Sequence, residues 1–116
     1  MPVETLIKQA IAEVSVLEPQ QAFESLDRFL VVDVREPNEV LQGYLPGAIN
    51  VPRGLLEFRA ADDPRFQPLD RPLLLYSNSG RRSALAARCL KELDYTRVAI
   101  LRDGIDAWAA LGLPVE

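Results

Sequence analysis

The side chains best suited to chemistry in this chain lie together in one short run, Ser77–Ser83. It holds three hydroxyls, one amide, one glycine and two arginines. The apolar segment Leu73–Tyr76 precedes it and a segment of helical periodicity follows, which predicts a loop from a buried strand into a helix. Such a loop turns backbone N–H groups toward one point, where the helix dipole adds partial positive charge.

Two interpretations of this loop follow from the residue types alone. Gly80 lets the backbone curl, the amides of Asn78 and Ser79 add donors, and Arg81 and Arg82 supply charge and planar donor groups. Together they form a binding site for a small anion. The spacing fits an ordinary capped turn equally well, in which Ser83 is the N-cap and both arginines are solvated.

Several kinds of catalysis are excluded by the composition. The chain has no histidine, so Ser-His-Asp and Cys-His catalysis and histidine-ligated metals are impossible within it. Its one cysteine, Cys89, excludes an internal disulfide and a Cys-based zinc site, so we expect no metal, no cofactor and a reducing, cytoplasmic location. Cys89 shares a predicted helical stripe with Leu85 and Leu93 and is expected to be a small core residue.

Length and charge restrict the class of protein further. The chain has 116 residues, 48% of them hydrophobic, which suits a single domain covering residues 1–116. The net charge is −4 with acids and bases interspersed, so a nucleic-acid partner is not expected. We expect no membrane association, because no apolar run approaches the roughly 20 residues that span a bilayer and the N-terminus does not resemble a signal peptide.

Apolar runs and helical periodicities alternate along the chain. This alternation predicts an α/β fold with about five parallel strands and helices on both faces of the sheet. The expected strands are Val16–Leu17, Phe29–Val34, Ala48–Val51, Leu73–Tyr76 and Val98–Leu101. The expected helices are Val3–Val14, one from Glu18 through Leu26, one from Glu36 through Leu41, Gly54–Ala60, Ser83–Leu93 and Ile105–Leu111. Trp108 is expected in the core.

This architecture indicates where a ligand would bind. Ligands of open α/β sheets bind beyond the carboxyl ends of the strands. Besides Ser77–Ser83, the segments Asp33–Glu36 and Val51–Gly54 leave such ends. Asp33, Arg35 and Arg53 are therefore candidates to flank the loop, although Asp33 is better explained as a hydrogen-bonded structural carboxylate than as a base.

Three motifs in the right order resemble the rhodanese-homology domain, the fold of single-domain thiosulfate sulfurtransferases. The first is Asp33–Glu36 with Glu39 and Gly43–Pro52, the second is the loop and helix start Tyr76–Ala84, and the third is Gly104–Trp108. The resemblance covers nearly the whole chain and implies a parallel, helix-covered sheet. It also implies a small sulfur-containing anion such as thiosulfate, or a sulfur-acceptor protein, as partner.

By position, the resemblance places Ser77 where active members carry the cysteine that becomes a persulfide. Arg82 then corresponds to the closing arginine, and Asn78–Arg81 supply the cradle amides. Asn78 stands where arginine is common, and Tyr44 replaces a usual histidine. A serine hydroxyl forms no persulfide, so this chain is expected to be unable to carry sulfur.

Two functional classes stay open. The chain is a thiosulfate sulfurtransferase whose catalytic cysteine has been replaced by serine, or a natural non-catalytic module that binds an anion or a protein. Dual-specificity phosphatases with this fold use a loop one residue longer. Because only four residues separate Ser77 from Arg82, and because the thiol is missing, phosphatase activity is not expected.

Overall fold

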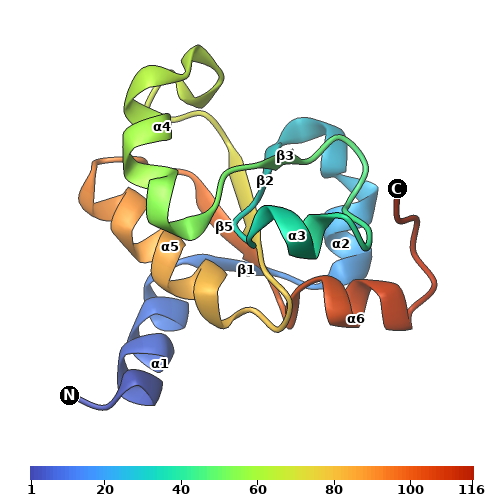
Figure 1. Ribbon diagram of the computed structural model, residues 1–116. Helices are drawn as coiled ribbons and strands as arrows, with labels where there is room; N and C mark the ends of the chain where they lie inside the picture. Colours follow the sequence, from blue (N-terminus) through green and yellow to red (C-terminus); the bar gives the residue numbers. More distant parts are fainter.

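The computed structural model describes residues 1–116 as a five-stranded parallel sheet covered by helices on both faces (Figure 1). The strands are β1 (Ser15–Leu17), β2 (Leu30–Asp33), β3 (Ile49–Asn50), β4 (Leu73–Tyr76) and β5 (Val98–Leu101). Their order across the sheet is β1-β5-β4-β2-β3. The predicted parallel α/β architecture is confirmed.

The structure has six α-helices: α1 (Val3–Glu13), α2 (Pro19–Glu24), α3 (Pro37–Val40), α4 (Leu56–Asp62), α5 (Arg81–Glu92) and α6 (Gly104–Ala110). Short 3₁₀ turns lie at Leu26–Arg28, Arg53–Leu55 and Pro64–Phe66. None of these helices has the length and apolar character needed to cross a membrane.

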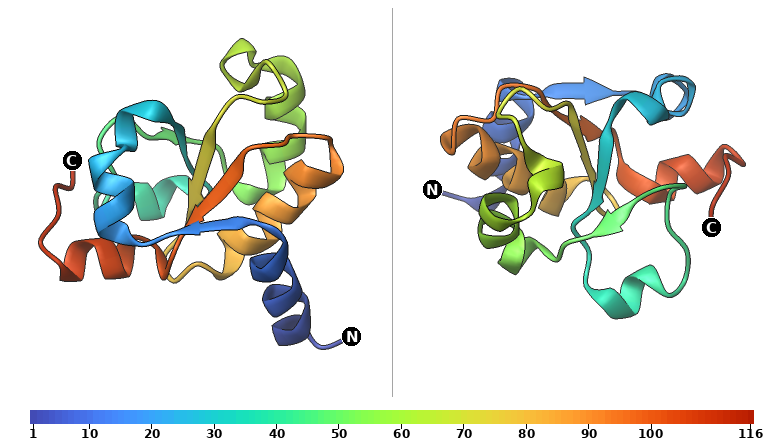
Figure 2. Two further views of the ribbon diagram at one scale, coloured as in Figure 1. Left: turned by 180° about the vertical axis from the view of Figure 1, so that it is seen from behind. Right: turned by 90° about the horizontal axis from the view of Figure 1, so that it is seen from above.

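The central strands β2, β4 and β5 are buried on both faces, which explains their uninterrupted apolar sequences. Alternate residues of each strand point to opposite faces and form two separate hydrophobic clusters. The larger cluster joins the sheet to α1, α4 and α5, and the smaller one joins it to α2 and α6. Figure 2 shows these two groups of helices on opposite sides of the sheet. Trp108 is fully buried in the smaller cluster, as predicted.

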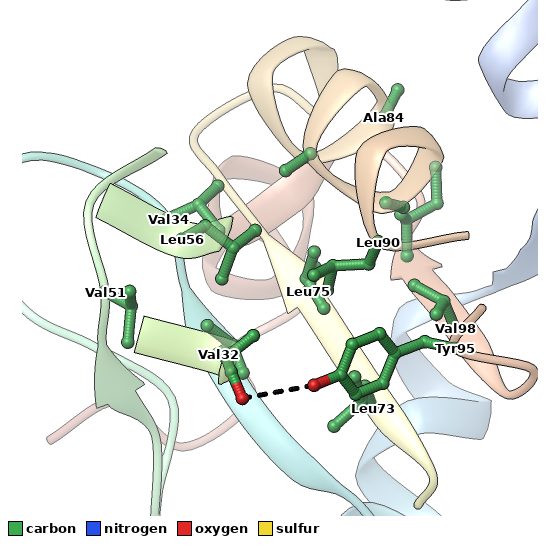
Figure 3. Close-up of a cluster of buried hydrophobic side chains, with 14 of the residues drawn as sticks. Val32, Val34, Val51, Leu56, Leu73, Leu75, Ala84, Leu90, Tyr95 and Val98 are labelled. Carbon is green, nitrogen blue, oxygen red and sulfur yellow. Dashed lines mark hydrogen bonds between the residues drawn. The ribbon is translucent and has the colours of Figure 1, made fainter. Parts of the chain in front are cut away.

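The larger cluster holds α5 in place behind the candidate loop. Ala84, Ala87 and Leu90 of this helix share the cluster with Leu73 and Leu75 of β4. Figure 3 shows Ala84 and Leu90 on the side of the helix that faces this strand. In the same cluster, the hydroxyl of Tyr95 donates to the carbonyl of Ala60 at 3.1 Å, which satisfies a polar group inside the core. The strand before the loop and the helix after it are therefore both fixed by burial.

The predicted face of α5 is wrong. Leu85 and Cys89 are only half-buried and Leu93 is 44% exposed, whereas the alanine face meets the sheet. Small side chains allow a helix to approach a sheet closely, so the alanines and Leu90 take the core positions. Cys89 is therefore not the buried core residue that its spacing indicated.

Candidate functional site

The Ser77–Ser83 segment leaves the carboxyl end of β4 and enters the first turn of α5. The helix begins at Arg81, two residues earlier than predicted, and its N-cap is Gly80 rather than Ser83. Gly80 has a φ of +98°, in the left-handed region that glycine adopts without strain. The chain therefore turns at Gly80, and Arg81 and Arg82 belong to the helix.

Ser77 is nearly fully buried, with 1% of its surface exposed. Its Oγ accepts the backbone N–H of Ser83 at 3.2 Å and donates to Ser83 Oγ at 3.3 Å. The Ser83 hydroxyl in turn donates to the carbonyl of Gly80 at 3.1 Å. Ser77 is thus tied to the first turn of α5, and both buried hydroxyls have partners.

The back of the loop is fixed to the start of α6. The carbonyls of Ser77 and Asn78 accept the N–H groups of Ile105 and Asp106 at 3.0 and 3.1 Å. A Cβ at Gly104 would lie 2.3 Å from both of these carbonyl oxygens, closer than any side chain tolerates. Glycine at position 104 is what allows the loop to pack directly on the α6 backbone.

The loop also has backbone N–H groups without an acceptor in the chain. None of the five backbone N–H groups from Asn78 to Arg82 donates a hydrogen bond within the chain. They belong to a turn with a left-handed residue and to the N-terminus of a twelve-residue helix. Free amides in this setting, together with the helix dipole, are suited to binding a small anion.

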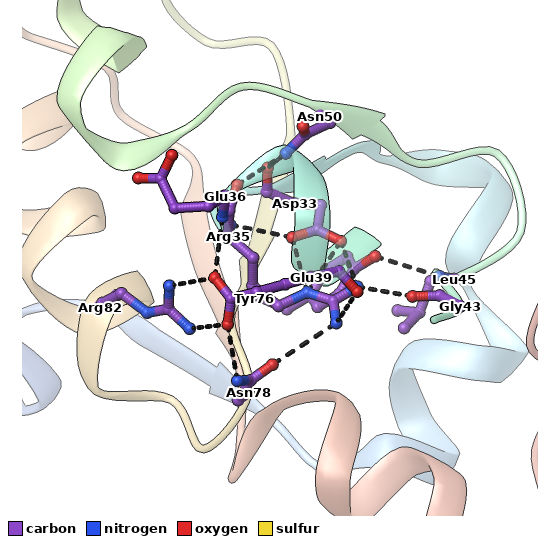
Figure 4. Close-up of polar contacts among 10 residues, drawn as sticks. All are labelled: Asp33, Arg35, Glu36, Glu39, Gly43, Leu45, Asn50, Tyr76, Asn78 and Arg82. Atoms are coloured by element: carbon purple, nitrogen blue, oxygen red, sulfur yellow. Dashed lines mark hydrogen bonds and ion pairs between the residues drawn. The ribbon is translucent and has the colours of Figure 1, made fainter. Parts of the chain in front are cut away.

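Glu39 of α3 connects the two ends of the loop (Figure 4). Its carboxylate accepts hydrogen bonds from Arg82 Nη1 and Nη2 at 2.7 and 2.9 Å, and from Asn78 Nδ2 at 2.9 Å. It also accepts the N–H of Glu36 at 2.9 Å, as the second half of a capping box. The Arg82 guanidinium and the Glu36 N–H lower the pKa of Glu39 from 4.5 to about 2.

Sequence reasoning included Glu39 in a motif but assigned it no role at the loop. Glu36 and Glu39 have the spacing of a capping box around Pro37, which predicts a helix start but no contact 43 residues away. The partnership with Arg82 arises only when β2 and β4 pair side by side.

Asp33 and Arg35 form a buried ion pair beside the loop. Arg35 is 4% exposed, and its Nε and Nη2 lie 3.0 and 2.7 Å from the Asp33 carboxylate. Arg35 also donates to the carbonyl of Gly43 at 2.6 Å and to Asn78 Oδ1 at 3.4 Å. Burial, followed by the neighbouring Asp33 carboxylate, raises the pKa of Tyr76, whose ring lies under the Arg35 guanidinium.

Arg53 makes its polar side-chain contacts away from the loop. Its guanidinium lies 3.0 Å from Glu57 and 3.1 Å from the Sγ of Cys89, on the middle of α5. Arg81 remains at the loop but forms an ion pair with Glu4 of α1 at 2.5 Å.

Each arginine predicted for the site is therefore paired with a carboxylate. The pairs are Arg35–Asp33, Arg53–Glu57, Arg81–Glu4 and Arg82–Glu39. Because these charges are balanced locally, the free backbone amides are the donors that would contribute most to the attraction of any anion.

The fold and loop define a parallel α/β domain with a turn of free backbone amides at a strand-to-helix junction. Residues 16–111 match the model of the rhodanese-like domain, and the chain belongs to that family. A sulfurtransferase of Allochromatium vinosum is 42% identical over 86 residues, which cover 74% of this chain and 77% of the relative.

Two solved structures have the same fold. A protein of unknown function from Rhodopseudomonas palustris, described as a possible tyrosine phosphatase, superposes with a TM-score of 0.93 at 28% identity, over 100% of this chain and 95% of that one. The homodimeric polysulfide-sulfur transferase of Wolinella succinogenes has a TM-score of 0.81 at 26% identity, covering 97% and 85% of the two chains.

Proposed function

We propose that this domain has the site of a thiosulfate sulfurtransferase in which Ser77 stands in the position of the sulfur-carrying cysteine. In this form it binds a small sulfur oxyanion at Ser77–Ser83 and transfers no sulfur. The sulfurtransferase relative and the free amides of the loop support this assignment. We also propose a reducing, cytoplasmic location for the domain, as its low cysteine content predicts.

The observation that carries the proposal is the space around Ser77 Oγ. Its hydrogen bonds with the Ser83 hydroxyl and N–H are 3.3 and 3.2 Å long. Hydrogen bonds between two hydroxyls are usually about 2.7–2.8 Å, and those from an amide to oxygen about 2.9–3.0 Å. Sulfur is larger than oxygen and makes longer hydrogen bonds, so a cysteine at position 77 fits these distances, and its sulfur would accept the Ser83 N–H as the hydroxyl does.

A thiolate at this position would perform a balanced two-step transfer. The thiolate attacks the outer sulfur of thiosulfate, a new S–S bond forms, and the old S–S bond breaks with its electron pair leaving on sulfite. A nucleophile such as cyanide, or the thiol of an acceptor protein, then takes the outer sulfur and regenerates the thiolate. Amides at a helix N-terminus stabilise the thiolate and hold the departing sulfite.

A second candidate function is a non-catalytic binding module. It is favoured by the complete hydrogen bonding of the serine site, where no buried polar side-chain atom lacks a partner. In that case Ser77 is the native residue, and the same amides serve only to recognise an anion or an acidic group on a partner protein.

The test is the Ser77→Cys variant, compared with Ser79→Cys. Ser79 is an exposed serine two residues away in the same loop, so its replacement adds a thiol without placing it at the buried position. We expect thiocyanate formation from thiosulfate and cyanide, and a mass gain of one sulfur, only in the Ser77→Cys variant. The unchanged chain, which retains Cys89, measures the background.

A folded Ser77→Cys protein that gives neither signal would reject the sulfurtransferase proposal and leave the binding module. Equal activity in the two variants would show that a thiol elsewhere in the loop suffices, and that the position of Ser77 has no special role.

A further inference from the structure

One carboxylate contacts both ends of the anion-binding loop. Glu39 Oε2 accepts the side-chain amide of Asn78, the first residue after Ser77, and both carboxylate oxygens accept the guanidinium of Arg82 (Figure 4). Asn78 and Arg82 are four residues apart, and the turn at Gly80 lies between them. The five free amides of the loop all lie within this span.

Glu39 is itself held in a fixed position. Pro37 begins α3, and the reciprocal bonds of the capping box join Glu36 to Glu39. The Glu39 side chain is 25% exposed and Arg82 is 38% exposed, so the pair lies at the surface of the loop, partly shielded from water. A partly shielded, doubly hydrogen-bonded pair restrains geometry better than a fully solvated one.

Asn78 is held from its other side as well. Its Oδ1 accepts Arg35 Nη1 at 3.4 Å, and Arg35 is fixed in turn by its buried pair with Asp33. The start of the loop is therefore linked to the end of β2, and the end of the loop to α3. Without Glu39, Arg82 would keep no polar side-chain contact that connects it to the rest of the site.

We propose that Glu39 is a positioning residue that fastens the two ends of the loop to each other and so sets the spacing of its amides. This inference rests on the proposed function, because the spacing matters only if the amides bind an anion. Glu39 does not touch the bound anion. It acts through Asn78 and Arg82.

The matched variants are Glu39→Gln and Glu57→Gln. Glutamine also serves at the third position of a capping box, so Glu39→Gln keeps the start of α3 while removing the charge that binds Arg82. Glu57 of α4 pairs with Arg53 of the preceding 3₁₀ turn, so Glu57→Gln removes an equal charge and one arginine pair away from the loop.

The first measurement is amide hydrogen exchange without any anion. The N–H groups of Ser83, Ile105 and Asp106 bond to Ser77 Oγ and to the loop carbonyls, so they report directly on how firmly the loop is held. We expect their exchange to become about tenfold faster in Glu39→Gln, as a loss of about 1.4 kcal/mol in local stability would produce. Exchange of the β5 amides should not change, and Glu57→Gln should leave all of these rates unaltered.

The second measurement is sulfate affinity, from amide shifts in the Asn78–Arg82 segment. We expect the dissociation constant to rise about three- to tenfold in Glu39→Gln and not in Glu57→Gln. Unchanged exchange at the three reporter amides would overturn the proposal. Tighter sulfate binding in Glu39→Gln would overturn it too, because Glu39 would then only compete with anions for Arg82.

Failure of this inference can be distinguished from failure of the proposed function. Hydrogen exchange needs neither a thiol nor a bound anion, so it tests the fastening of the loop even if Ser77→Cys transfers no sulfur. Conversely, sulfur transfer by Ser77→Cys with unchanged exchange in Glu39→Gln would uphold the function and reject the role of Glu39.

Discussion

Replacing Gly104 with alanine should destabilise the domain by forcing the loop away from α6. Gly104 has a φ of +63°, and its added Cβ would lie 2.3 Å from the carbonyl oxygens of Ser77 and Asn78. The left-handed conformation costs alanine about 1–2 kcal/mol. Overpacking against the two carbonyls adds about 1–3 kcal/mol, for a total of about 2–5 kcal/mol.

Gly112→Ala is the matched control. Gly112 has a φ of +73°, similar to that of Gly104, but a Cβ there would meet nothing within 4 Å. Gly112→Ala should therefore lose only the stability that the left-handed conformation costs alanine, about 1–2 kcal/mol. The difference between the two variants isolates the collision with the loop.

The assay is urea unfolding at equilibrium, followed by a sulfate titration of each folded variant. Gly104→Ala should lose both more stability and more sulfate affinity than Gly112→Ala, because the displaced carbonyls move the loop amides with them. Equal losses of stability in the two variants would refute the close approach of the loop to α6. A larger loss in Gly104→Ala with unchanged sulfate affinity would refute the location of the anion site.

Three further predictions concern the loop and its surroundings. The protein should not hydrolyse p-nitrophenyl phosphate, even as Ser77→Cys, because four residues separate Ser77 from Arg82; phosphate release above that of a blank would contradict this. The depressed pKa of Glu39 adds stability that is fully present above about pH 4.5 and is lost as the pH falls toward about 2. In Arg82→Ala the titration midpoint of the Glu39 carboxyl, measured by NMR, should rise toward 4.5. An unchanged midpoint would show that Arg82 is not the main cause of the lowered pKa. The half-buried Cys89 should react with a thiol reagent in the folded protein, though more slowly than in denaturant, and complete protection would contradict its partial exposure.

The central strands could be predicted because each corresponds to one short, unbroken run of apolar residues. Leu73–Tyr76 and Val98–Leu101 have the predicted bounds, since burial on both faces requires an unbroken apolar run. The edge strand β3 is shorter than predicted, at Ile49–Asn50, whereas the other edge strand, β1, is one residue longer than predicted, at Ser15–Leu17. Local sequence does not reveal which strand becomes an edge.

The errors at α5 have a similar origin. Gly80 is the N-cap in a left-handed conformation, so the helix begins at Arg81 and not at Ser83 as predicted. Leu85 and Leu93 indicated the wrong buried face, because hydrophobicity alone does not register how closely an alanine face can approach a sheet. The location of the loop could be predicted, since it depends on neighbouring elements. The partners of its arginines could not, because Glu39 and Arg82 are 43 residues apart.

The pairing of the arginines bears on how far binding and catalysis depend on each other at this site. Arg81 and Arg82 are both paired with carboxylates, so under the proposed function the attraction for an anion would come mainly from backbone amides. A change of side chain at position 77 leaves those amides in place, provided that Ser83 and Gly104 still hold the loop. Exchanging sulfur for oxygen there therefore removes the nucleophile without removing the binding site. It follows that the sulfurtransferase and the binding module share one binding step, and that anion affinity alone cannot distinguish them, whereas Ser77→Cys can.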